Sequence, residues 1–252
     1  MPLHRTEAIV LRSYRVGEAD KVVVFLTRDQ GKIRGLARGA RRPRSRFGGS
    51  LEIGSEVELT LFEKEGAELA RIDRCDIIRS SFSCSADAIL ASTLGYFAEL
   101  TDAFAQEREP NEKLYRLLRA ALGALVELGG EDREKTSRYF EAWLLRLCGY
   151  YPRGEVCASC GRELKSGGGF YRLEDRELRC AACASVGIPL SAATLGYLNQ
   201  VWQRGPGELP QPESPSVLPE LALLHKKMIQ HELDRELRSQ SVLEELSGSK
   251  KV

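Results

Sequence analysis

The sequence predicts an α+β protein with an N-terminal OB-fold β-barrel, followed by an α-helical domain that carries a small four-cysteine module. Three observations predict this architecture. Short β-type runs fill the first part of the chain, apolar residues then recur at helical spacing, and two Cys-x-x-Cys motifs interrupt the helical part. The domains that we expect are the barrel over residues 1–80, the helical domain over 81–150 and 191–238, the cysteine module over 151–190 and a flexible tail over 239–252.

The barrel is predicted from five short runs that are rich in β-branched residues and are separated by glycine-containing turns. One of them alternates most regularly and places Val57, Leu59 and Leu61 on a single face. Five short antiparallel strands favour an OB-fold, and an SH3-like barrel is the alternative that periodicity does not separate from it. The runs cover residues 7–14, 21–27, 32–37, 56–62 and 69–77.

Helices are predicted after the barrel because apolar residues recur every three or four positions. Breaks in this pattern fall at residues 109–111, at the glycines of 129–130 and at Gly149. Most of these apolar stripes are expected to form the core. The stripes before the cysteine module cover residues 89–104, 114–125 and 139–147.

Two further helices are predicted after the cysteine module. Ser191 is expected to cap the first of them, which runs to Trp202, because a serine side chain satisfies the free amides of a first helical turn. A proline-rich loop then leads to a last helix with an apolar face over residues 221–233. His225 and His231 lie six positions apart on that helix, do not share a face, and are expected to be surface residues rather than ligands.

The cysteine motifs predict a structural zinc site. Two Cys-x-x-Cys pairs separated by nineteen residues match the spacing of closed sites in which four thiolates surround one zinc ion. Disulfides fit less well, because the N-terminus has no apolar signal region, no transmembrane-length run occurs, and the seven cysteines are an odd number. The predicted ligands are Cys157, Cys160, Cys180 and Cys183, whereas Cys75, Cys84 and Cys148 are expected to be small core residues.

The charge of the chain is unevenly distributed. The net charge is only +1, but residues 1–50 contain twelve Lys or Arg against four Asp or Glu. A stretch between Gln30 and Leu51 is basic without one acidic residue, and its glycines and proline indicate a strand followed by an exposed loop. Its cationic residues are Lys32, Arg34, Arg38, Arg41, Arg42, Arg44 and Arg46.

This basic stretch predicts contact with a polyanion, since arginine forks match phosphate oxygens and clustered like charges repel unless they meet an anion. The plain alternative is a solvated basic surface. Aromatic residues for base stacking are few in the barrel. We therefore expect backbone contact with single- and double-stranded nucleic acid, weak sequence preference and an affinity that falls with salt.

Motifs of common enzymes are absent from the sequence. There is no Walker A loop, no dinucleotide fingerprint and no Gly-x-Ser-x-Gly elbow, and His231-Glu232 is not followed by the second histidine of a zinc protease. We therefore expect a protein without enzymatic activity and without catalytic residues.

Several motifs, in this order, resemble those of the bacterial RecO family of recombination-repair proteins. The similar stretches are residues 6–12, 17–20, 39–49, 145–152 and 157–161, and the resemblance extends over about residues 3–235. It implies an N-terminal OB-fold that binds single- and double-stranded DNA, a helical domain and a nearby zinc ribbon with one structural zinc ion per chain. It also implies annealing of complementary strands without ATP, and a cytoplasmic, nucleoid-associated protein.

The resemblance further implies three protein partners. These are RecR, the acidic C-terminal tail of single-stranded DNA-binding protein, and RecA, which is loaded onto DNA with the help of RecR. Transferred to this sequence, the DNA-contacting set is the basic group of residues 32–46, with Arg12, Arg15 and Lys21 as additions. The tail would bind the helical domain, where Arg116, Arg119 and Arg146 are candidates.

Two alternatives remain open from the sequence. A zinc-ribbon OB-fold protein that binds RNA, in translation or ribosome assembly, would share the basic loop, and a preference for strands that carry 2′-hydroxyl groups would favour it. The other alternative is a scaffold whose basic face binds an acidic protein, in which case DNA would compete only weakly with that protein.

Overall fold

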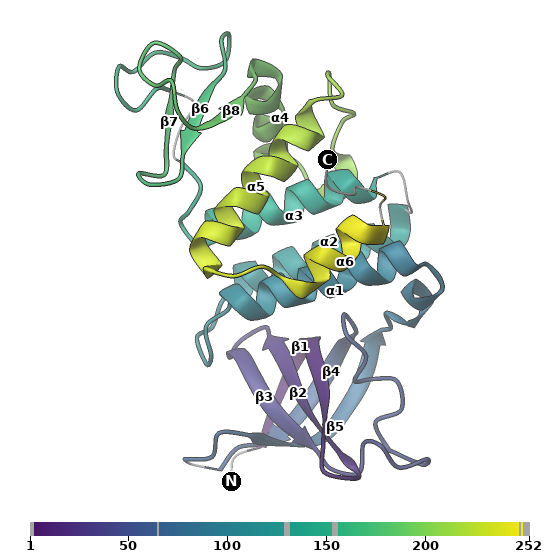
Figure 1. Ribbon diagram of the computed structural model, residues 1–252. Coiled ribbons are helices and arrows are strands. Elements are labelled where there is room, and N and C mark those ends of the chain that lie inside the picture. Colours follow the sequence, from purple (N-terminus) through teal and green to yellow (C-terminus); the bar gives the residue numbers. More distant parts are fainter. Residues whose placement is uncertain (1–2, 65, 129–131, 153–155, 247, 249–252) are drawn as a thin grey trace. The chain divides into compact units, whose positions relative to one another are not determined.

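The chain forms two compact units in a computed structural model that describes residues 3–64, 66–128, 132–152, 156–246 and 248 (Figure 1). The first unit comprises Met1–Val126 with Leu237–Val252, and the second comprises Glu127–Glu236. The division falls inside the helical region, so the helices of this region are shared between the two units. No helix in the described ranges is long and apolar enough to cross a membrane.

The first unit contains a closed five-stranded barrel, as the sequence predicts. The strand order is β1-β2-β3-β5-β4, β1 also pairs with β4, and only the short β3–β5 pairing is parallel. This order defines the OB-fold rather than an SH3-like barrel. The strands are β1 (Leu3–Val16), β2 (Asp20–Thr27), β3 (Gly31–Ala37), β4 (Glu56–Phe62) and β5 (Ala70–Arg79).

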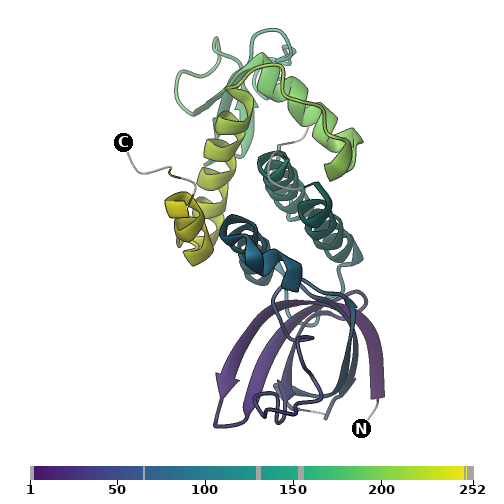
Figure 2. The ribbon, with the colours of Figure 1, turned by 90° about the vertical axis from the view of Figure 1, so that its right-hand side faces the viewer.

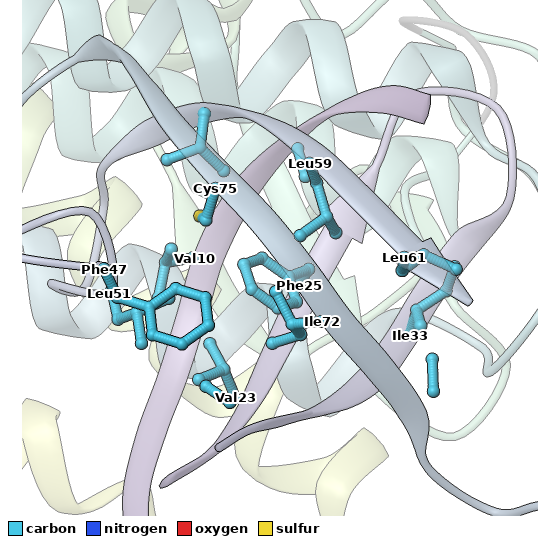
Figure 3. Packing of buried hydrophobic residues seen from close by; sticks show 14 residues of the cluster. Val10, Val23, Phe25, Ile33, Phe47, Leu51, Leu59, Leu61, Ile72 and Cys75 are labelled. Carbon is cyan, nitrogen blue, oxygen red and sulfur yellow. The ribbon is translucent and has the colours of Figure 1, made fainter. Parts of the chain in front are cut away.

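The barrel interior is filled by one face of each strand (Figure 3). The predicted inward row of β4, residues Val57, Leu59 and Leu61, is at most 1% exposed. Phe47 and Leu51 come from the long β3–β4 connection and fold back into the same core. The connection is therefore anchored in the barrel after it leaves β3.

Part of the outward face of β1 and β2 is also buried, because helix α1 (Ala88–Phe104) packs on it. This explains why Val22 and Val24 on β2 are apolar although they lie on the opposite face from the barrel core. Asp87 caps α1 by accepting hydrogen bonds from the amides of Ile89 and Leu90, at 2.9 and 3.0 Å. The 3-10 turn η1 (Phe82–Ala86) precedes this helix, and α2 (Glu112–Leu128) follows it.

The C-terminal segment is a helix where the sequence analysis expected only a flexible tail. Helix α6 (Arg238–Leu246) lies alongside α1 in both views (Figures 1 and 2). The carboxylate of Glu99 on α1 accepts hydrogen bonds from the amides of Arg238 and Ser239, at 3.3 and 2.9 Å. Because the cap of α6 comes from another helix, no local capping signal announces it.

The second unit combines three helices with a small sheet (Figure 1). Ser191 caps α4 as predicted, since its hydroxyl accepts a hydrogen bond from the amide of Thr194 at 3.2 Å. The expected break at residues 129–130 lies outside the described residues. The elements are α3 (Arg133–Leu147), β6 (Gly169–Arg172), β7 (Glu177–Arg179), β8 (Ile188–Leu190), α4 (Ala192–Gln203), the 3-10 turn η2 (Pro206–Glu208) and α5 (Val217–Leu233).

The expectation that both histidines of α5 lie on the surface is wrong for His225. Its side chain is fully buried, and its ring nitrogens lie 3.0 Å from the Tyr151 hydroxyl and 2.9 Å from the Glu141 carboxylate. Burial lowers the pKa of His225, despite the neighbouring carboxylate. A polar residue is tolerated here because buried partners from other segments satisfy both of its nitrogens. His231 is exposed, as expected.

The three cysteines outside the two motifs lie where small apolar residues are expected. Cys75 and Cys84 are buried and Cys148 is half-buried. Burial raises the pKa of the Cys75 thiol and of the Cys148 thiol to about 11. These thiols are therefore protonated and unreactive near neutral pH.

Candidate functional site

The basic loop of residues 38–46 is held at both ends by the barrel core. It starts after Ala37 and ends before Phe47, which are 0% and 3% exposed. Two hydrogen bonds also join it to the β1–β2 turn: the Arg41 amide donates to the carbonyl of Ala19 at 2.9 Å, and the Gly39 amide donates to the Asp20 carboxylate at 2.8 Å. The loop is thus a fixed feature of this end of the barrel.

Strand register adds two more cations to the same end. Arg15 pairs with Lys21 across the β1–β2 hairpin, and Lys21 pairs with Ala37, the last residue of β3. The loop leaves β3 at this point, so these side chains flank it. We call this group the basic barrel end; its members are Arg15, Lys21, Arg38, Arg41, Arg42, Arg44 and Arg46.

The arginines of the basic barrel end fall into two kinds. Arg38, Arg42 and Arg44 are exposed, and no ion pair joins them to an acidic side chain in the described part of the chain. Arg41 donates to the carbonyls of Gly17 and Glu18, at 3.2 and 2.8 Å. Exposed guanidinium groups without a carboxylate partner keep their full fork of donors for an external anion.

Arg46 has a role similar to that of Arg41. Its guanidinium lies 4.9 Å from the ring centre of Phe47 and donates to the carbonyl of Ile72 on β5 at 3.3 Å. Both arginines therefore help to hold the loop in place while they remain exposed.

Three other cations of the predicted DNA-contacting set have a different environment. These are Arg12, Lys32 and Arg34. Lys32 is only 12% exposed and lies 3.2 Å from a carboxylate oxygen of Asp102, and Arg12 lies 4.0 Å from the same carboxylate. Arg34 forms an ion pair with Glu107. The structure thus places these residues on the outward face of the strands, beside acidic residues from the end of α1 and the loop after it. Two carboxylates, of Asp102 and Glu107, therefore offset part of the charge of these three cations.

The three candidate tail-binding arginines have different environments. Arg119 on α2 lies 2.6 Å from the buried carboxylate of Glu56, which also contacts Arg79 at 3.3 Å and the Tyr115 hydroxyl at 3.2 Å. Arg119 therefore balances a buried charge. Arg116 is exposed on the same helix, whereas Arg146 belongs to the second unit.

The four motif cysteines converge in the second unit, as the spacing predicts. Their sulfur atoms all lie within 4.8 Å of one another, and those of Cys160 and Cys180 are 3.8 Å apart. Gly161 has a φ of 72°, which lets the first motif turn back so that its amide bonds to the carbonyl of Cys157 at 2.9 Å. Cys157 and Cys180 are buried, whereas Cys160 is exposed.

The electrostatics of this cluster fit a bound cation. Hydrogen bonds from backbone amides, first that of Cys180, lower the pKa of Cys157 to about 6. The neighbouring cysteines, first Cys160, raise the pKa of Cys183 to about 12. Four thiolates at this spacing repel one another unless a metal ion balances them. A soft, four-sulfur donor set of this size suits Zn²⁺ in a closed tetrahedral site.

The cysteine module is joined to the helices by polar and ring contacts that the sequence analysis missed. The hydroxyl of Tyr171 on β6 donates to the carbonyl of Tyr150 at 3.1 Å. Arg176 lies over the Tyr150 ring at 4.8 Å and pairs with Glu232 of α5 at 2.9 Å. These contacts depend on the folded chain, so no local motif reveals them.

The fold and these sites define a class: an OB-fold protein with a basic barrel end and a four-cysteine module. Comparison with known proteins is more specific. The model of the N-terminal domain of recombination protein O matches residues 1–81, and that of its C-terminal domain matches residues 86–241. The chain therefore belongs to the recombination protein O (RecO) family.

Individual relatives agree with the family match. The chain is 42% identical over 173 residues to a DNA repair protein RecO of Koribacter versatilis, covering 69% of this chain and 70% of the relative. It is 32% identical over 242 residues to the DNA repair protein RecO of Anaeromyxobacter sp. strain K, covering 94% of each chain. It is also 34% identical over 196 residues to that of Geobacter sulfurreducens, covering 78% and 79%.

Proposed function

We propose that this protein is a DNA-binding recombination mediator without enzymatic activity that acts in recombinational DNA repair. The observation that carries the proposal is the basic barrel end, where Arg38, Arg42 and Arg44 are exposed on a loop anchored in the barrel core. Membership of the RecO family, whose relatives are named DNA repair protein RecO, supports DNA as the polyanion.

The DNA contact in this proposal is with the phosphate backbone. Arg15, Lys21 and the three exposed loop arginines approach the phosphates, and Arg41 and Arg46 hold the loop while their charge adds to the field. Arg12, Lys32 and Arg34 contribute less, because the carboxylates of Asp102 and Glu107 offset part of their charge. Since phosphates are common to all sequences, binding extends to single and double strands and shows weak sequence preference.

Strand annealing follows from the same surface. Two complementary strands repel one another through their phosphates, and a fixed cluster of arginines screens that repulsion and raises the local concentration of both strands. The step involves no bond cleavage and no nucleotide hydrolysis, so the mechanism requires neither a catalytic residue nor ATP.

The proposed partners follow the RecO family. The protein joins RecR, contacts the acidic C-terminal tail of single-stranded DNA-binding protein, and helps RecR to load RecA onto DNA coated with that protein. Arg116 is the tail-binding candidate on α2 that forms no ion pair within the described residues, whereas Arg119 pairs with Glu56. The proposed location is the cytoplasm, in association with the nucleoid.

The four-cysteine cluster is proposed to hold one structural zinc ion. Cys157, Cys160, Cys180 and Cys183 would be its ligands, and all four positions of a tetrahedron would be taken by protein. When bound, the ion cross-links the two motifs and balances the thiolate charge. The chain's own residues then keep the module in contact with α5 through Arg176 and Glu232.

The mediator role is tested by RecA loading onto gapped DNA coated with single-stranded DNA-binding protein. RecA filament growth is followed by its ATP hydrolysis, with RecR and this protein added singly or together. The proposal expects stimulation only when both are present, and its loss in the Arg38→Ala/Arg42→Ala/Arg44→Ala variant. Equal stimulation by RecR alone, or a preference of the protein for RNA over DNA of the same sequence, would overturn it.

A further inference from the structure

Both tryptophans of the chain, Trp143 and Trp202, lie together in the second unit. Their ring centres are 5.3 Å apart and the rings are nearly perpendicular, at 88°. The indole N–H of Trp143 donates to the carbonyl of Val201 at 3.0 Å, and Tyr151 packs edge-on against Trp202 with its ring centre 5.1 Å away. These contacts fix the two indoles as an aromatic corner between α3 and α4.

The guanidinium of Arg146 covers this aromatic corner. Its central carbon lies 4.4 Å from the ring centre of Trp202 and 5.2 Å from that of Trp143. Arg146 is exposed and the indoles are half-buried. Within the described ranges, no hydrogen bond or ion pair of Arg146 is found. The cation–π contacts hold the guanidinium beside the indoles, and its N–H groups meet no protein acceptor within the described ranges.

The surroundings of Arg146 favour an anionic ligand. Residues 142–152, at the end of α3 and beyond, contain no aspartate or glutamate, and neither do residues 192–204, which include α4. Arg204 is exposed at the end of α4 and adds a second positive charge near Trp202 in sequence. An oriented guanidinium without a nearby carboxylate in either segment is suited to binding an anion rather than to stabilising the fold.

We propose that Arg146, Trp143 and Trp202 form a stacking site for an unpaired nucleobase of single-stranded DNA, with an adjacent phosphate on the guanidinium edge. An arginine plane layered on an indole offers a flat face on which a base stacks, while its N–H groups reach phosphate oxygens. A ligand that offers only a carboxylate would bind the N–H groups of the guanidinium but would not stack on its plane. The inference rests on the proposed DNA-binding function and adds a second contact to it.

The site would give the protein a means to distinguish single strands from duplex. In the barrel, Phe25 and Phe47 are buried, whereas Tyr14 on β1 is exposed, with the Arg12 guanidinium 5.8 Å from its ring centre. The basic barrel end contacts phosphates, which both forms of DNA present. Bases of a duplex are already stacked inside it and cannot reach a guanidinium plane on a protein surface. Stacking on Arg146 is therefore restricted to unpaired bases.

Intrinsic fluorescence tests the site directly, because every tryptophan signal of the chain comes from it. The full chain is titrated with end-labelled oligothymidylate and with a duplex of equal length, and anisotropy of the label reports total binding. We expect saturating oligothymidylate to quench tryptophan emission and the bound duplex to leave it unchanged. Arg146→Ala and Arg146→Lys should weaken oligothymidylate binding roughly 5-fold or more, with duplex binding unchanged.

The variants separate stacking from charge. Arg146→Lys keeps the charge but loses the planar group, so it should behave like Arg146→Ala. Arg235→Ala serves as the matched control, because Arg235 is exposed in the same unit and lies over no aromatic ring among the described residues; it should bind oligothymidylate like the unchanged chain. Arg146 is exposed, so its replacement leaves the fold intact, which circular dichroism verifies.

The outcomes distinguish this inference from the proposed function. Three results would overturn the stacking site and leave the proposed DNA binding intact. These are binding of oligothymidylate without quenching, equal quenching by duplex, and oligothymidylate binding by Arg146→Lys that is as tight as that of the unchanged chain. Absence of binding to either DNA would instead overturn the proposed function. Quenching by the acidic C-terminal peptide of single-stranded DNA-binding protein, with none by DNA, would assign the site to that peptide and overturn the inference.

Discussion

The salt dependence of DNA binding offers a quantitative test of which arginines contact phosphate. The logarithm of affinity falls with the logarithm of salt concentration, with a slope of about −0.7 per phosphate contact on single strands and about −0.9 on duplex. Replacing three exposed loop arginines should thus reduce the slope by about 2 on single strands and by about 2.7 on duplex. The variant is Arg38→Ala/Arg42→Ala/Arg44→Ala.

The effect is large enough to measure by anisotropy of labelled DNA. Over a fourfold rise in salt, a slope difference of about 2 means that the unchanged protein loses about 16-fold more affinity than the variant. A second triple variant of the same barrel removes the same charge from arginines that are already paired with Glu58, Glu112 and Asp76. This control is Arg5→Ala/Arg28→Ala/Arg74→Ala.

The control variant should retain the slope of the unchanged protein, because its arginines are engaged within the protein. It should also stay folded, since surface ion pairs contribute only about 0–1 kcal/mol to stability. Equal slopes for the loop variant and the unchanged protein would refute the assignment of these three arginines. Equal reductions in both triple variants would show that net charge, rather than the basic barrel end, determines binding.

Three further predictions concern metal, pH and helix capping. Cys160→Ser should lower the zinc content from one ion per chain to well below one, by mass spectrometry of the metal, and full retention would contradict the site. Because burial lowers the pKa of His225, the unfolded chain binds more protons below the usual histidine pKa of about 6.5; the free energy of unfolding should therefore fall as pH drops below that value, and the same slope in His225→Gln would contradict this. Glu99→Ala should lower the free energy of unfolding by about 1 kcal/mol and speed hydrogen exchange in α6 but not in the barrel. Unchanged exchange in α6 would refute the capping role of Glu99.

The parts of the fold that the sequence predicts well are those determined by local patterns. Alternation along β4 identifies Val57, Leu59 and Leu61 as barrel core, and the spacing of the four cysteines identifies the cluster, since both signals lie within a few residues of the chain. The hydroxyl of Ser191 is a local cap and was predicted for the same reason.

The parts that the sequence analysis missed depend on partners far away in the chain. Helix α6 is capped by Glu99, and the burial of His225 depends on Glu141. Likewise, the charge of Lys32 is balanced by Asp102, which is distant in sequence. A count of basic residues cannot separate such a neutralised lysine from the free arginines of the loop, whereas the ion pairs in the folded structure do so at once.

The central claim is that the basic barrel end brings complementary DNA strands together. The most direct measurement is annealing of two complementary oligonucleotides coated with single-stranded DNA-binding protein, without nucleotide. We predict fast annealing by the unchanged protein and by the Arg5→Ala/Arg28→Ala/Arg74→Ala control, and its loss in Arg38→Ala/Arg42→Ala/Arg44→Ala with fold and zinc retained. Annealing at full rate by the loop variant, or none by the folded, zinc-loaded unchanged protein, would contradict the claim.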